Sequence, residues 1–247
     1  MNIAMWSGPR NLSTAMMRSF GNRADCVVWD EPFYAAYLAE TGLDHPMRAE
    51  VLAAGETDWR KVAERCVGPG PGEKAIFYQK HMTHHMVPAF ERDWIDKVTN
   101  AFLIRAPERV LASYAAKRED PTLADIGFVA QAELFARAAD RLGHAPPVLD
   151  AEDVRGFPKS SLKLLCEALR IPFDPAMLSW APGPRPEDGA WAPHWYDGLW
   201  RSTGFAPPED GPPPDLPPAL ARLADAARPH YDALRRHRLR PETGEGA

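Results

Sequence analysis

Short, continuous runs of apolar residues alternate with helix-like segments through the first two thirds of this 247-residue chain. The alternation narrows the choice of fold, because a strand without alternating polar positions needs cover on both of its faces. A parallel sheet with helices on either side provides that cover. Four apolar runs and a weaker fifth are the expected strands, at residues 3–6, 26–29, 75–78, 101–104 and 147–149.

Helical spacing predicts helices at residues 13–20, 107–118, 123–142 and 160–169, and a final amphipathic helix at 216–238. Pro107 suits the first turn of its helix, where the missing N–H is no loss. The sequence therefore predicts an α/β fold. It is expected to be a three-layer α/β/α sandwich whose central, mostly parallel sheet is like that of P-loop nucleoside triphosphatases, with a Pro-rich C-terminal extension.

The composition shifts near residue 181, where the chain becomes dense in Pro and Gly. Large aromatic side chains within residues 181–205 favour an ordered loop packed on the domain, because they are costly to leave in water. Residues 206–218 are expected to be a loose connector, and residues 240–247 are expected to fray. We predict one domain over residues 1–205. Residues 206–247 would add a connector and a helix packed on or trailing from that domain.

Bulk properties exclude several functions. The formal net charge of -5 argues against a nucleic-acid-binding surface, although a small anionic ligand needs only local positive charge. No run approaches the roughly 18 apolar residues of a membrane span, so no membrane partner is expected. The three cysteines are widely spaced and form no CxxC pair, which favours a reducing, cytoplasmic location. Nothing in the sequence indicates the oligomeric state.

A loop suited to an anion follows the first strand: Ser7-Gly8-Pro9-Arg10-Asn11-Leu12-Ser13-Thr14. It opens a helix, whose first N–H groups and positive dipole end favour an oxyanion. Arg10 can grip planar oxygens with two hydrogen bonds, and Ser13 or Thr14 can add a hydroxyl. The loop does not match the GxxxxGK[ST] pattern of nucleoside triphosphatases. In the alternative interpretation Ser13 only caps the helix and Arg10 is a solvated surface residue.

A second such loop follows the fourth strand, at Arg105-Ala106-Pro107-Glu108-Arg109, with Ser113 further along the helix. Arg109 and Ser113 are four residues apart and therefore share a helix face. The alternative is an ordinary strand–helix turn with solvated arginines. Two anion loops in one chain indicate a ligand with two separated anionic groups.

Together the two loops resemble the sulfotransferase family, in particular its small bacterial sulfotransferase-like proteins. A third stretch is similar too: residues 148–154, followed by Pro158, Leu165-Cys166 and Pro172-Phe173. The resemblance covers roughly residues 2 to 180, with the motifs in the family's order. Residues 200–204 would be a shortened counterpart of a basic, glycine-rich loop near the C-terminus of many members.

The resemblance implies a co-substrate, 3′-phosphoadenosine 5′-phosphosulfate (PAPS), whose product is adenosine 3′,5′-bisphosphate. The first loop, residues 7–14, would cradle the 5′-phosphosulfate. Arg105 and Ser113 would hold the 3′-phosphate. No metal is expected, because the sequence lacks a clear Mg²⁺-binding set.

Sulfuryl transfer needs a base for the acceptor's proton and cations on the developing charge. The segment Gln79-Lys80-His81-Met82-Thr83-His84-His85 follows the third strand and offers both. We favour His81 or His84 as base, with Lys80 at the sulfuryl oxygens; His85 stays open. Glu31, after the second strand, is an alternative base, an acceptor-orienting group or a helix cap. A metal site through His81 and His85 and a purely structural role are further alternatives.

The sequence thus predicts a sulfotransferase acting on a hydroxyl or amine of a small-molecule acceptor. Aromatic side chains at 33, 34, 37, 191, 195 and 200 would line the acceptor pocket or form plain core packing. One rival is a Mg²⁺-dependent, kinase-like phosphotransferase on the same sheet. The other is a nucleotide-binding protein that has lost catalysis.

Overall fold

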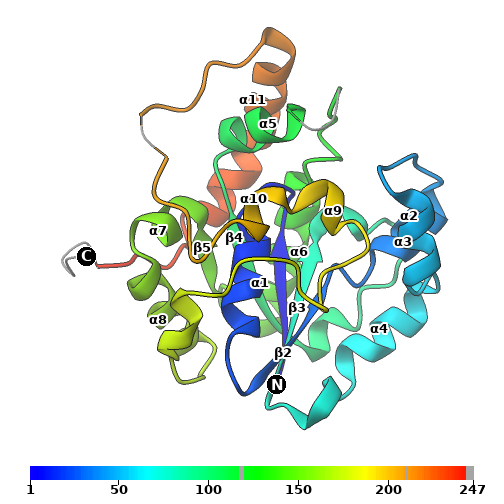
Figure 1. The fold of residues 1–247 in the computed structure, drawn as a ribbon. Helices are drawn as coiled ribbons and strands as arrows, with labels where there is room; N and C mark the ends of the chain where they lie inside the picture. Colours follow the sequence, from blue (N-terminus) through cyan, green and yellow to red (C-terminus); the bar gives the residue numbers. More distant parts are fainter. Residues whose placement is uncertain (117–119, 210, 243–247) are drawn as a thin grey trace.

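A computed structural model describes residues 1–116, 120–209 and 211–242 (Figure 1). Five strands form one parallel sheet in the order β2-β3-β1-β4-β5. Their bounds are β1 Asn2–Ser7, β2 Cys26–Asp30, β3 Ile76–Met82, β4 Thr99–Ile104 and β5 Val148–Asp150. Each predicted strand is confirmed, as is the α/β/α sandwich.

The strand order brings three loops to one place. β1 lies in the middle of the sheet, and its last residue, Ser7, is in register with Met82 of β3 and Leu103 of β4. β3 and β2 lie on one side of β1, and β4 and β5, which come later in the chain, lie on the other side. In open parallel sheets such a reversal leaves a crevice beyond the carboxyl ends of the strands.

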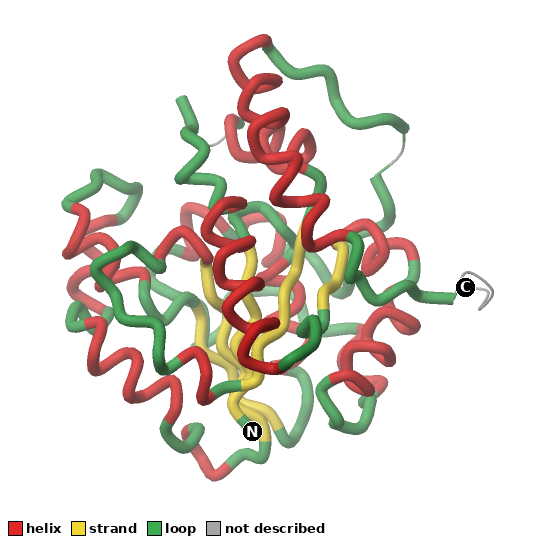
Figure 2. Tube along the Cα trace, turned by 180° about the vertical axis from the view of Figure 1, so that it is seen from behind, coloured by secondary structure: helices red, strands yellow, loops and turns green. Residues whose placement is uncertain are grey.

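Helices cover both faces of the sheet, as the apolar strands require (Figures 1 and 2). Ile3 and Met5 of β1 pack with α1 (Ser13–Gly21) and α8 (Pro158–Ala168). Ala4 and Trp6 face the other layer. That layer contains α4 (Trp59–Val67), α5 (Pro107–Ala115), α6 (Phe128–Leu142) and α11 (Pro218–Arg235).

Shorter elements connect these layers. The α-helices among them are α2 Tyr34–Thr41, α3 Arg48–Ala54, α7 Ala151–Gly156, α9 Ala192–Trp195 and α10 Asp197–Trp200. The 3₁₀ turns are η1 Pro71–Glu73, η2 Thr83–His85, η3 Ile95–Lys97 and η4 Pro175–Leu178.

Two predicted helices differ in their bounds. α5 ends at Ala115, and residues 117–118 of the predicted helix lie outside the described residues. α6 starts at Phe128 instead of residue 123, because the Asp125 carboxylate accepts hydrogen bonds from the N–H and hydroxyl of Thr122. This local side-chain turn competes with the helix at its start.

The C-terminal third lies against the sheet domain. Trp191 and Tyr196, in the segment 181–205, share an apolar cluster with Tyr34 and Tyr37 of α2. α11 packs on α5 and α6. The sequence predicts a loose connector at residues 206–218, but Glu209 forms ion pairs with three arginines of the domain. No helix in the described part of the chain has the length and apolar character needed to cross a membrane.

Candidate active site

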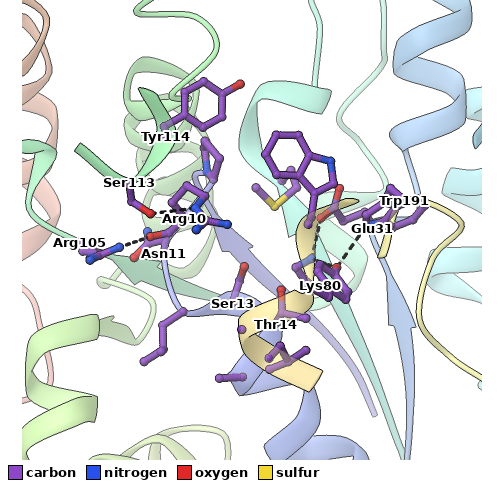
Figure 3. A pocket seen from close by; sticks show the side chains of 18 of the residues that line it. Arg10, Asn11, Ser13, Thr14, Glu31, Lys80, Arg105, Ser113, Tyr114 and Trp191 are labelled. Carbon is purple, nitrogen blue, oxygen red and sulfur yellow. Dashed lines mark hydrogen bonds and ion pairs between the residues drawn. The ribbon is translucent and has the colours of Figure 1, made fainter. Parts of the chain in front are cut away.

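A cavity of about 470 Å³ lies beyond the carboxyl ends of the strands. The loops after β1, β2, β3 and β4 line it, together with α9, α10 and the segment that follows them. Figure 3 shows Arg10, Ser113 and Arg105 on one side of this cavity and Glu31, Lys80 and Trp191 on the other. Both predicted anion loops therefore open into one space.

The backbone of the first loop has a conformation suited to an anion. Arg10 (φ 57°) and Leu12 (φ 64°) are left-handed, which costs non-glycine residues about 1–3 kcal/mol each. Alternation of left-handed and right-handed residues turns successive N–H groups to one side, as in anion-binding nests. Gly8 lets the loop pack closely, because a Cβ there would lie 2.7 Å from the Ile126 carbonyl oxygen.

The start of α1 faces the cavity. Leu12 is its N-cap residue, and no side chain caps the helix. The first N–H groups of a helix have no acceptor within it, so they are available to an anion here. Ser13 and Thr14 line the same cavity. The structure therefore does not support the alternative in which Ser13 serves only as a helix cap.

Direct hydrogen bonds join the two loops. Arg10 Nε donates to Ser113 Oγ at 2.9 Å, and Arg105 Nη1 donates to the Arg10 carbonyl oxygen at 2.5 Å. Asn11 Nδ2 anchors the first loop to the end of β4 by donating to the Leu103 carbonyl oxygen at 2.7 Å. Burial lowers the pKa of Arg10 and of Arg105. Anions are favoured beside such partly desolvated guanidinium groups.

Glu209 lies at the far end of the arginine side. Its carboxylate accepts from Arg105, from Arg155 Nη1 at 2.6 Å and from Arg109 Nη1 at 3.0 Å. Arg109 also contacts Glu152 at 2.9 Å. Arg105, Arg155 and Glu209 all line the cavity, whereas Arg109 is not among the lining residues.

Lys80 forms a buried network at the opposite end. Its Nζ donates to Asp30 Oδ1 at 2.8 Å, Glu31 Oε1 at 2.6 Å and the Tyr196 hydroxyl at 2.7 Å. Tyr196 in turn donates to Asp30 Oδ2 at 2.7 Å. Burial acts to lower the pKa of Lys80, but the two carboxylates outweigh it and raise that pKa well above its usual value. Lys80 is a fixed cation.

Glu31 is the carboxylate of this network that faces the cavity, with its side chain 11% exposed. Burial raises the pKa of Glu31 to about 7, against the opposing effect of the nearby Lys80 charge. A carboxyl group with a pKa near neutrality can act as a general base. Glu31 also has a left-handed backbone (φ 40°), so the turn after β2 is held in an uncommon conformation beside the site.

His81 and Ser7 lie outside the cavity lining, contrary to expectation. Alternate residues of a strand point to opposite faces, so His81 points away from the face of Lys80. The His81 ring stacks on Trp6 with centroids 4.5 Å apart, and burial lowers the pKa of His81 to about 3. Ser7 is fully buried, and its hydroxyl faces Met82. The assignment of His81 as base is therefore corrected.

His84 and His85 reach the cavity from the turn after β3. His85 is sandwiched between the rings of Tyr34 (4.7 Å) and Tyr37 (4.8 Å). Burial lowers the pKa of His85 well below its usual value. His81 and His85 face different surroundings, and no group of three His, Cys, Asp or Glu side chains suited to a metal gathers among the described residues.

The sulfotransferase domain family matches residues 1–238. The chain belongs to the sulfotransferase family. Its fold is similar to a sulfotransferase from Alicyclobacillus acidocaldarius (TM-score 0.56, 12% identity, 95% of this chain and 94% of that one). It is also similar to the sulfotransferase domain from the curacin biosynthetic pathway (TM-score 0.52, 15% identity, 92% and 96%).

Two curated relatives come from Arabidopsis thaliana. Branched-chain-amino-acid aminotransferase-like proteins 2 and 1 are 36% and 37% identical over 235 residues, or 95% of this chain. The match covers 41% and 42% of those proteins. This chain therefore spans about two fifths of the length of these curated relatives.

The part of the cavity beside Glu31 has aromatic walls. Tyr34, Trp191, Trp195 and Tyr196 line it beside Glu31. Trp191 meets Tyr34 edge to face at 5.0 Å, and its Nε1 donates to the Tyr196 hydroxyl at 3.2 Å. Phe33, Tyr37 and Trp200, which the sequence also offers as candidates, are not among the lining residues.

Sequence reasoning missed three charged residues of this site: Asp30, Arg155 and Glu209. Asp30 is paired with Lys80 in the β2–β3 register, but nothing local indicates that these strands are neighbours. Arg155 follows the β5 motif at the end of a short helix. Glu209 lies in a Pro-rich stretch, and an acidic residue there gives no signal by itself.

Proposed function

We propose that this protein transfers a sulfuryl group from PAPS to a hydroxyl or amine of a small-molecule acceptor. Arg10, the amides of the first loop and the hydroxyls of Ser13 and Thr14 bind the 5′-phosphosulfate. Arg105 and Ser113 bind the 3′-phosphate. The observation that carries the proposal is the Arg10–Ser113 hydrogen bond, because it joins two anion loops within one cavity.

Transfer requires the acceptor atom in line with the bond that breaks. The acceptor oxygen or nitrogen attacks sulfur, the bond from sulfur to the 5′-phosphate oxygen breaks, and adenosine 3′,5′-bisphosphate leaves. The charge that develops on the leaving phosphate lies at Arg10 and the start of α1, where fixed donors are most effective.

Glu31 is our preferred base, and its carboxylate takes the acceptor's proton. It faces the cavity, and its pKa of about 7 lets it accept a proton near neutral pH. Lys80 holds Glu31 in place through the 2.6 Å ion pair. His84 is the second candidate, because it lines the same cavity.

Calorimetry with adenosine 3′,5′-bisphosphate tests the nucleotide assignment. We expect binding by the wild type and by the control Arg137→Ala, which removes an arginine that pairs with Asp93 and Asp96 away from the cavity. The double variant Arg105→Ala/Ser113→Ala should bind at least about 100-fold more weakly, since each charge-assisted contact contributes about 1.5–3 kcal/mol. Equal binding by both variants would refute the assignment.

Transfer of labelled sulfate from PAPS to a library of alcohols and amines tests the reaction. We expect transfer to continue in the presence of a chelator. A requirement for Mg²⁺ with ATP as donor would instead support the kinase-like phosphotransferase, and bisphosphate binding without any transfer would support a nucleotide-binding protein that has lost catalysis.

A cytoplasmic location stays a prediction. The three cysteines, Cys26, Cys66 and Cys166, are buried free thiols.

A further inference from the structure

One carboxylate, that of Glu209, lies among three guanidinium groups at the nucleotide end of the cavity. It accepts hydrogen bonds from Arg105, from Arg155 Nη1 at 2.6 Å and from Arg109 Nη1 at 3.0 Å. Arg109 Nη2 also donates to the Gly211 carbonyl oxygen at 2.9 Å. The stretch of chain that carries Glu209 is thus fastened across the arginines by charge-assisted bonds.

The arginine cluster has more positive charge and more donors than Glu209 uses. Three guanidinium groups carry three positive charges. Glu209 neutralises one of them and Glu152, which pairs with Arg109, neutralises another, so one positive charge remains. Arg155 Nε is buried without a hydrogen-bond partner among the described residues. The side chains of Arg105 and Arg109 are about 10% exposed, so the cluster is partly desolvated and favours an anion. A phosphate dianion meets these requirements more fully than a carboxylate does.

Glu209 also lies where the proposed nucleotide would place its second phosphate. Arg105 contacts Glu209 through Nη2 and the Arg10 carbonyl oxygen through Nη1, and Arg10 contacts Ser113. The carboxylate and a phosphate held by Arg105 would therefore compete for the same guanidinium edge.

We propose that Glu209 is an internal competitor of the nucleotide's 3′-phosphate, which must displace this carboxylate from Arg105 and Arg155 to bind. The proposal rests on the proposed function. With Glu209 seated, only a fraction of the protein is competent to bind, and the apparent affinity falls by that fraction. When the phosphate replaces the carboxylate, Arg155 becomes one of its ligands.

The competition also makes the site selective. A nucleotide with a 3′-phosphate brings an anion that takes the place of the carboxylate on Arg105 and Arg155. Adenosine 5′-phosphate has no such group, so it gains nothing by displacing Glu209 and binds with the carboxylate in place. Removal of the Glu209 charge should therefore raise the affinity for the bisphosphate and leave the affinity for the monophosphate unchanged.

Calorimetric titration of the full chain with both nucleotides, at about 0.15 M salt to screen distant charges, tests the proposal. The variant is Glu209→Gln, which keeps the shape and removes the charge. The matched control is Glu187→Gln, because Glu187 is similarly exposed (27% against 25%), also pairs with an arginine, Arg18, and is not among the cavity-lining residues. Thermal unfolding checks that every variant is folded.

We expect Glu209→Gln to bind the bisphosphate about 5- to 20-fold more tightly than the wild type, which corresponds to about 1–2 kcal/mol. The monophosphate affinity and both affinities of Glu187→Gln should change less than about twofold. Adding Arg155→Ala to Glu209→Gln should reverse most of the gain.

Other outcomes separate this proposal from the proposed function. Unchanged or weaker bisphosphate binding by Glu209→Gln, with normal binding by the wild type and the control, overturns the competition and leaves the proposed function standing. An equal gain for both nucleotides also overturns it, because general electrostatics would then explain the effect. Failure of every protein to bind the bisphosphate refutes both proposals.

Discussion

Glu31 places its carboxyl group where the cavity meets the buried Lys80–Asp30 pair. Three properties make it a candidate base: contact with the cavity, a raised pKa and an ion pair that fixes its position. Replacement of Glu31 leaves the Lys80–Asp30 ion pair at 2.8 Å, so Lys80 is not stranded without a counter-charge. A variant at this position should therefore fold.

Glu31→Gln should lower the rate of sulfate transfer about 10²- to 10⁴-fold, the range for loss of a general base, with little change in bisphosphate affinity. The base must be ionised, and a pKa of about 7 means that its ionised fraction falls as the pH drops below 7. The kcat/KM of the wild type should fall about tenfold per pH unit there. In Glu31→Gln this dependence should vanish.

The control for this experiment is Glu133→Gln, which removes a carboxylate of the exposed Arg92–Glu133 pair. It should keep the wild-type rate and pH profile. An unchanged profile in Glu31→Gln would move the assignment to His84, and His84→Gln should then show the loss.

His81 should matter for stability and not for proton transfer. Its ring stacks with Trp6, and its Nε2 lies 3.1 Å from Gln79 Oε1. His81→Ala removes a buried ring and should reduce the free energy of unfolding in urea by about 1–3 kcal/mol. The kcat of the folded fraction should stay within about twofold of the wild type, and a far larger loss of kcat at unchanged stability would contradict this placement.

At the scale of elements, the loop after β1 depends on close packing. An added Cβ at Gly8 would lie 2.7 Å from the Ile126 carbonyl oxygen, so either this loop or the turn before α6 must move. Gly8→Ala should therefore weaken bisphosphate binding about tenfold or more, because the cradle of N–H groups loses its alignment. Gly68→Ala is the control, since Gly68 is not among the cavity-lining residues and the nearest atom to its added Cβ lies at an ordinary contact distance of 3.4 Å. Equal affinities in calorimetry would contradict the role of Gly8.

The elements that the sequence predicts are those with local signals. Continuous apolar runs located all five strands, and a polar loop before a helical pattern located two of the loops that line the cavity. The four-residue helices α9 and α10 escaped, because each is too short to show a helical period in a Pro-rich stretch. α2 and α3 were also not predicted. Their buried side chains pack against residues 191–196, and no local pattern in the sequence indicates that contact.

The sequence predicts the site residues that lie near a local sequence signal and misses those that depend on contacts between distant parts of the chain. Arg10, Ser13 and Arg105 lie at strand–helix junctions, and Ser113 lies on the helix that follows the second junction. All four line the cavity. The face of the sheet to which His81 points depends on how β3 pairs with its neighbours. The cluster of histidines at residues 81–85 therefore wrongly suggests that His81 is a base in the cavity. The contacts of Asp30 and Glu209 join residues 50 or more positions apart, so no local pattern reveals them.

At the scale of the whole molecule, charge is divided between the two ends of the cavity. The chain is acidic, with a formal net charge of -5, yet Arg10, Arg105 and Arg155 gather at the end of the cavity where we propose that the nucleotide binds. At the opposite end, where we propose that the acceptor binds, Lys80 is paired with Asp30 and Glu31, and the walls are aromatic. The local charge there is zero or negative, depending on Glu31.

This division predicts that acceptors are uncharged or cationic where they enter the aromatic walls. Matched pairs of alcohols, each supplied as a methyl ester and as the free carboxylate, provide the measurement. The carboxylate should have a kcat/KM about tenfold lower or worse, because an anion beside ionised Glu31 is repelled in a partly desolvated space. Glu31→Gln should narrow the ratio between their binding constants, measured by competition. Equal kcat/KM values within the pairs would mean that the acceptor's charge lies outside this end of the cavity.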